Sequence, residues 1–120
     1  MPPLFLLPLQ YKQMIRIGID SIDLDPAASA IGQALKVEFQ QRESSFRGGD
    51  YCRAEVREGS LIIQRNSDAL DEEPFEASWP ADKLVLYLDG LSDDAWQPYV
   101  RILCTFHDPE TRVLDADKSP

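Results

Sequence analysis

The sequence predicts an α+β fold, a mostly antiparallel sheet of about five strands with one main helix packed on one face. Several short segments alternate apolar and polar residues or form short apolar runs, as β-strands do, whereas one long segment has helical spacing. The helical segment comes second, so the predicted order is strand, helix and then four strands. A chain of 120 residues suits one domain with a single core. One helix covering one apolar sheet face is the simplest such arrangement.

The first strand and the helix are predicted from periodicity and capping. Residues 14–19, "MIRIGI", place three isoleucines at alternate positions, as in a half-buried strand. Residues 23–42, "DLDPAASAIGQALKVEFQQR", are predicted to form the helix, with Asp25 as the N-cap and Pro26 at the first helical position. The residues expected on its apolar face are Ala28, Ile31, Leu35 and Phe39.

The remaining strands follow a glycine-containing break, "SSFRGGD". Residues 51–65 are predicted to form a hairpin with its turn at residues 58–60. Residues 83–90, "KLVLYLDG", are apolar at successive positions and are therefore predicted to form a central strand. Residues 98–106, "PYVRILCTF", alternate and are predicted to form the last strand.

The two cysteines, Cys52 and Cys104, do not form a C-x-x-C pair, and each occupies an alternating apolar position of a predicted strand. We therefore expect both to be buried free thiols that pack as small hydrophobes. Free thiols fit a reducing compartment, which favours the cytoplasm.

Residues 14–107 are expected to form the single α+β domain. The segments before and after them differ from it in composition. Residues 1–13, "MPPLFLLPLQYKQ", have no basic start, are interrupted by prolines and are too short to span a membrane, so we expect neither export nor membrane insertion. We take as a hypothesis that the natural chain begins at Met14, which would make residues 1–13 an upstream extension. Residues 108–120 are polar and are expected to form a flexible tail.

Negative charge is concentrated in one part of the chain. The net charge is −9, and residues 1–65 contribute nothing to it, with eight basic and eight acidic residues. Residues 66–94 contain nine acidic residues and one lysine. A field of one sign steers a partner of the opposite sign, so this segment predicts a basic protein partner. Nucleic acid is not the expected partner because the lysines and arginines are scattered along the sequence.

Most of this charge lies in "NSDALDEEPFEASWPADK", residues 66–83, which we name the acidic loop. It is predicted to connect the third and fourth strands, and connections this long tend to be functional. Phe75 and Trp79 are expected to anchor it, leaving its carboxylates facing outward. The segment "LDGLSDDAW" supplies a second acidic group. The predicted partner-binding residues are Asp68, Asp71, Glu72, Glu73, Glu76, Trp79, Asp82, Asp93 and Asp94.

Catalytic and metal-binding patterns are weak in this sequence. The single histidine, His107, lies near the end of the last predicted strand, and Cys104 is expected to point to the opposite face from it. Asp20, Asp23 and Asp25 lack the spacing of an EF-hand loop, and the cluster at residues 71–73 is only a weak divalent-ion candidate. We therefore expect no enzymatic activity, no cofactor and no metal.

The run "QRNSDALDEEPFEASWPADKLVLYLDG", from Gln64 to Gly90, resembles small acidic bacterial immunity proteins of the contact-dependent inhibition and polymorphic-toxin type. The resemblance lies in an asparagine and acidic stretch followed by a proline and an apolar strand that contains tyrosine, and it covers under a quarter of the chain. It implies a non-catalytic cytoplasmic protein that binds a cognate toxin domain, often a basic nuclease, and blocks it.

Two other classes of function remain open at this stage. A structural or adaptor subunit could use the same acidic segment to bind another basic protein. An enzyme or metal-dependent protein is the third class, and it would be indicated by turnover that is lost in a His107→Ala variant.

Overall fold

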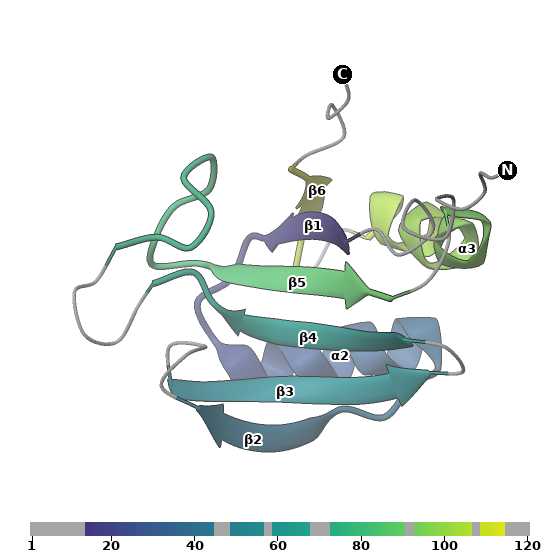
Figure 1. The fold of residues 1–120 in the computed structure, drawn as a ribbon, viewed down its shortest axis with the longest axis horizontal. Coiled ribbons are helices and arrows are strands. Elements are labelled where there is room, and N and C mark those ends of the chain that lie inside the picture. Colours follow the sequence, from purple (N-terminus) through teal and green to yellow (C-terminus); the bar gives the residue numbers. More distant parts are fainter. Residues whose placement is uncertain are drawn as a thin grey trace, which may run out of the picture.

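The computed structural model describes residues 14–44, 49–56, 59–67, 73–90, 93–106 and 109–114. Within them, an open six-stranded antiparallel sheet in the order β2-β3-β4-β5-β1-β6 carries two helices (Figure 1). The α+β fold class predicted from the sequence is thereby confirmed. In chain order the elements are β1 (Met14–Ile19), α2 (Leu24–Leu35), β2 (Gln40–Ser44), β3 (Gly49–Val56), β4 (Gly59–Arg65), β5 (Leu84–Asp89), α3 (Asp93–Cys104) and β6 (Thr111–Val113).

Both helices contribute to one hydrophobic core on the same face of the sheet. Ile31 of α2 and Trp96 of α3 are fully buried in the same cluster as the inward-facing residues of the central strands. Burial of apolar surface between these two layers is the main source of stability for such a fold. The opposite face, which we name the outer face, carries the alternate residues of the same strands.

Strand β5 lies between β4 and β1 and is buried on both faces, as predicted for residues 83–90. Leu84, Leu86 and Leu88 belong to the core under the helices. Val85 and Tyr87 belong to a second, smaller cluster that also contains Ile62 and contacts Tyr51 and Trp79. The apolar run therefore reflects a cover on each side of the sheet, and the outer-face cover includes the acidic loop.

Helix α2 is shorter than predicted. Its N-cap is Asp23, without a side-chain capping hydrogen bond, and it ends at Leu35, after which Lys36 adopts the left-handed conformation with φ of 61°. The amide of Val37 then donates to the carbonyl of Gly32 at 3.0 Å, which closes the helix end. Residues 40–44 pair with β3 as an edge strand, so tertiary pairing overrides their helical spacing.

We expect a Lys36→Gly variant to be more stable than the parent chain. The left-handed conformation costs a non-glycine residue about 1–2 kcal/mol, which exceeds the extra backbone entropy that glycine loses on folding. The free energy of unfolding in a urea titration should therefore rise by about 0.5–1 kcal/mol. A decrease would show that the aliphatic part of Lys36 contributes more than its backbone strain costs.

The strand predicted at residues 98–106 is wrong, because Asp93–Cys104 form helix α3. The same residues also have helical spacing, and Trp96 and Leu103 are buried one above the other while Ile102 is exposed. Pro98 lies inside the helix. The strand prediction rested only on the alternation of apolar and polar residues in this segment.

Three further predictions can be compared with the structure. The hairpin of β3 and β4 is confirmed, although Gly59 and Ser60, which were predicted to lie in its turn, pair with Val56 and Glu55 as the start of β4. Strand β6 pairs with β1 inside the range predicted as a flexible tail, so ordered structure continues to residue 114. Cys52 is buried as predicted, whereas Cys104 is exposed near the end of α3. Residues 1–13 and 115–120 lie outside the described residues.

Candidate functional site

The acidic loop leaves β4 and returns to β5 at one end of the sheet (Figure 1). Residues 66–67 and 73–83 of the loop are described. Its two ends meet, because the amide of Asn66 donates to the carbonyl of Lys83 at 2.8 Å. A long connection of this kind in a compact domain is often functional.

The Asn66 side chain holds the loop in shape. Asn66 is fully buried, and its Nδ2 atom donates to the carbonyl oxygens of Glu76 at 3.0 Å, Trp79 at 2.8 Å and Pro80 at 3.2 Å. Its Oδ1 atom accepts a hydrogen bond from the Glu76 amide at 2.7 Å. A single buried amide thus ties together backbone carbonyls from three loop positions, of which those of Glu76 and Pro80 also accept hydrogen bonds from the amides of Trp79 and Lys83. The short loop segment around residues 76–80 therefore has a defined conformation.

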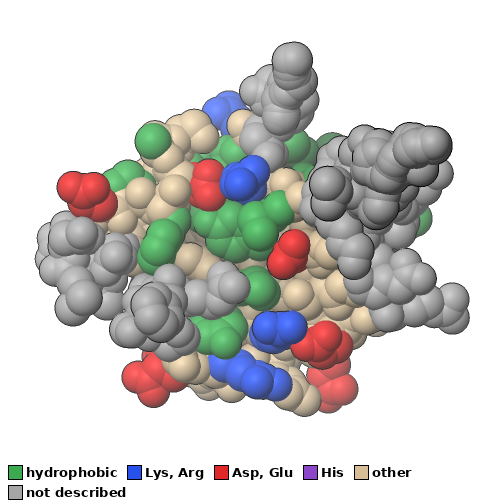
Figure 2. Space-filling view, in the orientation of Figure 1, with side chains coloured by type: hydrophobic (Ala, Val, Ile, Leu, Met, Phe, Trp, Pro, Cys, Tyr) green, Lys and Arg blue, Asp and Glu red, His purple; other side chains and the backbone are tan. Residues whose placement is uncertain are grey.

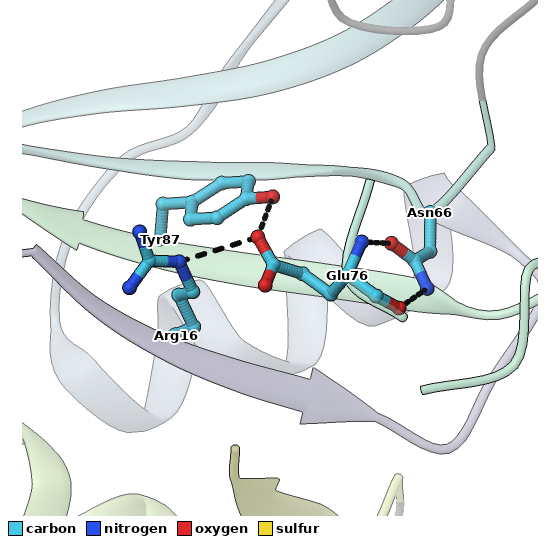
Figure 3. A network of polar contacts seen from close by, with 4 residues as sticks. All are labelled: Arg16, Asn66, Glu76 and Tyr87. Atoms are coloured by element: carbon cyan, nitrogen blue, oxygen red, sulfur yellow. Dashed lines mark hydrogen bonds and ion pairs between the residues drawn. The ribbon is translucent and has the colours of Figure 1, made fainter. Parts of the chain in front are cut away.

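The Glu76 side chain attaches the loop to the outer face. Its Oε2 atom accepts a hydrogen bond from the Tyr87 hydroxyl at 2.8 Å and lies 3.2 Å from Arg16 Nε (Figure 3). Arg16 and Tyr87 are cross-strand partners on β1 and β5. The Glu76 side chain is only 20% exposed, so this carboxylate turns toward the sheet and does not face outward as predicted. The reason is that two donors on adjacent strands converge on it.

Trp79 anchors the loop by packing on the backbone of β1. A β-carbon placed on Gly18 would lie 2.5 Å from two atoms of the indole ring, so only glycine lets the ring lie this close. Trp79 also contacts the small cluster of Ile62, Val85 and Tyr87. The predicted anchoring of the loop by Trp79 is therefore confirmed.

The end of the loop is tied to the end of β1. Lys83 forms an ion pair with Asp20, and the amide of Leu84 donates to the carbonyl of Ser21 at 3.1 Å. The hydrogen bond to Asp20 raises the pKa of Lys83, and the charges of Asp20 and Asp82 act in the same direction. Lys83, the only lysine of the acidic loop, is thus paired with a carboxylate from outside the loop. This carboxylate, that of Asp20, lies at the same end of the sheet.

The predicted binding residues fall into separate groups. Glu73 and Asp82 are exposed on the loop, whereas Asp68, Asp71 and Glu72 lie outside the described residues. Asp93 and Asp94 begin α3, after the other end of β5 (Figure 1). A six-residue strand spans about 20 Å, so the length of β5 separates the start of α3 from the described end of the loop. Acidic residues in a first helical turn are also favoured by the helix dipole, which gives this pair a structural reason.

The outer face combines apolar and charged side chains. Figure 2 shows apolar side chains across the middle of this face, with basic and acidic side chains bordering them. Cross-strand pairing puts Arg53 beside Ile62 and Arg16 beside Tyr87 on this face. Arg53 is paired with Glu55, whose Oε2 atom lies 2.7 Å from Arg53 Nε. Two of the arginines gathered here by the fold are therefore already paired with carboxylates.

The structure bears on only some of the catalytic candidates. Cys104 is described at the end of α3, and His107 lies outside the described residues. Within the described part of the chain, no three His, Cys, Asp or Glu residues gather closely enough to hold a metal ion. The described helices include none that is long and apolar enough to cross a membrane.

Comparisons with known proteins do not assign the chain to a family. No protein-family model, no curated protein and no solved structure matches the chain. The residues that organise the site, Asn66, Arg16 and Tyr87, were not singled out from the sequence. The one available signal was an asparagine placed directly after an apolar strand, where its amide can bond the backbone of a following turn.

Proposed function

We propose that this protein is a non-catalytic immunity protein that binds a cognate basic toxin domain in the cytoplasm and neutralises it. The acidic loop is the proposed contact surface. The observation that supports this most is that Asn66, Glu76 and Trp79 fix the described part of this loop at three separate points. A loop that only needed to be soluble would not require a fully buried clasp residue.

The fixed conformation of the loop favours binding through preorganisation. A loop that is ordered before binding loses less conformational entropy when a partner docks, so more of its contact energy appears as affinity. The carboxylates outside the clasp, including the exposed Glu73 and Asp82, then add a field that accelerates encounter with a basic surface. The resemblance of residues 64–90 to bacterial immunity proteins points to a toxin domain as the basic partner.

The proposal is tested by capturing the partner from the source cells. Tagged parent protein is compared with a loop variant in which Asp68, Asp71, Glu72 and Glu73 become Asn or Gln. A control variant neutralises four acidic residues elsewhere, Asp25, Glu38, Glu43 and Asp50, which are all exposed. The two variants have the same net charge and differ only in where the charge was removed.

We expect the parent and the control to retain one basic protein that the loop variant loses. Expressing that protein alone should stop growth of a heterologous host, and co-expressing the parent chain should restore growth. A captured partner that is harmless to the host would instead assign the protein to the adaptor class. Capture of the same protein by the loop variant would show that the acidic loop is not the contact surface.

A further inference from the structure

A cavity of about 170 Å³ lies on the outer face beside the Glu76 attachment. Its walls include the rings of Phe75 and Tyr87, the aliphatic side chain of Ile62, and three polar side chains, Arg16, Gln64 and Glu76. A protein cavity of about 150 Å³ is large enough to hold a benzene molecule. The space therefore suits one side chain of a partner and is too small for a folded segment.

The Glu76 carboxylate has accepting capacity left at this cavity. Both of its side-chain contacts, from Tyr87 and from Arg16, end on Oε2, and Oε1 carries no contact from any described residue (Figure 3). An ionised carboxylate can accept about four hydrogen bonds. A glutamate that bridges two arginines is a known arrangement in proteins. The pairing with Arg16 therefore does not prevent Glu76 from binding a second cation.

We propose that this cavity receives an arginine side chain of the partner, with its guanidinium donating to Glu76 Oε1 and lying against the aromatic walls. The inference rests on the proposed function, because it assumes a basic protein partner. Charge complementarity supports it, since residues 66–94 carry nine acidic residues and one lysine. Arginine fits better than lysine because a planar guanidinium stacks on Phe75 or Tyr87 and can bind a carboxylate through two N–H groups.

The location of the cavity agrees with the usual organisation of protein interfaces. Energetically dominant contacts are made by a few anchors, often arginine, in pockets surrounded by contacts that contribute less. Here the cavity lies between strands β1, β4 and β5 and the loop residues Phe75 and Glu76. The more exposed carboxylates of the loop would then act at the rim and mainly raise the association rate.

The test uses N-acetyl-arginine-N-methylamide as the probe, titrated into the isotope-labelled full chain and followed by NMR. The acetylated citrulline analogue has nearly the same shape without the charge, and the acetylated lysine analogue keeps the charge without the planar group. We expect the arginine probe to shift the signals of Phe75, Glu76 and Tyr87 and to bind about tenfold more tightly than the citrulline probe. The lysine probe should be intermediate.

Two variants assign the binding to this cavity. Glu76→Gln should weaken arginine binding about tenfold, whereas Glu55→Gln should leave it unchanged, although Glu55 also pairs with an arginine on the outer face. If Glu76→Gln loosens the loop, Phe75→Ala removes one aromatic wall and keeps the carboxylate, and it should weaken arginine binding several-fold. Equal binding of the arginine and citrulline probes, or equal effects of the two glutamate variants, would overturn the cavity assignment.

Poly-L-lysine separates failure of the cavity from failure of the proposed function. It probes the acidic surface without needing an aromatic pocket, so its salt-dependent binding should weaken in the loop variant more than in the control variant. That result together with a failed arginine titration would overturn only the cavity. Equal weakening of poly-L-lysine binding in both variants would instead contradict the acidic loop as a docking surface.

Discussion

Replacing Leu86 with alanine is expected to lower the free energy of unfolding by about 2–5 kcal/mol. Leu86 has no exposed surface, lies in the central strand β5 and is paired with Ile17 on β1 and Ile63 on β4, which are also buried. The shorter side chain loses transfer free energy and leaves a cavity that neighbours on both adjacent strands cannot easily fill. A urea titration followed by circular dichroism measures the change.

The matched control for Leu86 is Ile102→Ala. Ile102 is 39% exposed on α3, so the same kind of truncation there should change stability by less than about 0.5 kcal/mol. A loss below about 1 kcal/mol for Leu86→Ala would contradict the central position of β5 in the core.

Asn66→Asp is expected to destabilise the protein by about 2–4 kcal/mol near neutral pH, although the two side chains have almost the same shape. The substitution replaces an amide that donates to three carbonyl oxygens with a carboxylate that repels them. It removes one donor from each of these carbonyls, of which those of Glu76 and Pro80 keep the amides of Trp79 and Lys83 as donors, and it buries a charge. The introduced carboxyl should have a raised pKa, so the destabilisation should shrink as the pH falls through that value.

Hydrogen exchange shows whether the effect of Asn66 is local to the loop. The Glu76 amide donates to Asn66 Oδ1, so its protection should fall strongly in Asn66→Asp and in Asn66→Ala. Ser67→Ala is the control, because Ser67 is only partly buried and none of the hydrogen bonds described above involves its side chain. Unchanged protection of the Glu76 amide would show that Asn66 is not the residue that holds the loop.

The sequence predicts the parts of the fold in which local pattern and tertiary environment agree. The alternation in β1 and the doubly apolar run of β5 each have one structural interpretation, and both are confirmed. Residues 98–106 fit two periods, and the two-residue period on which the prediction rested is the wrong one. Residues 40–42 continue a helical pattern but are paired by β3. Such pairing between distant segments cannot be read from a local window.

The candidate site was predictable only in outline. The concentration of charge and the apolar anchors of the acidic loop follow from composition, and Trp79 does anchor it. Glu76 has the same chemistry as its acidic neighbours, and only the strand register that places Arg16 beside Tyr87 makes it an internal ligand. The clasp by Asn66 depends in the same way on three carbonyls that only the folded loop brings together.

This division assigns different roles to the acidic residues of the loop. Glu76 is a structural residue that also lines a cavity, so its substitution mixes effects on stability and binding. Asp68, Asp71, Glu72 and Glu73 are the loop carboxylates chosen to test electrostatic docking, because Glu76 is engaged in attaching the loop to the sheet. Asp93 and Asp94 lie beyond the other end of β5, so a partner on the loop reaches them only if its interface extends along the sheet.

The most direct test is stopped-flow association of the captured partner with the parent, the loop variant and the control variant, across a series of salt concentrations. The loop variant, with Asp68, Asp71, Glu72 and Glu73 neutralised, should associate more slowly than the other two proteins at low salt. Its rate should also depend less on ionic strength, because surface charges act through a field that salt screens. The control variant should keep most of the parent rate and its salt dependence. An association rate for the loop variant equal to that of the parent at every salt concentration would contradict a docking role for the acidic loop.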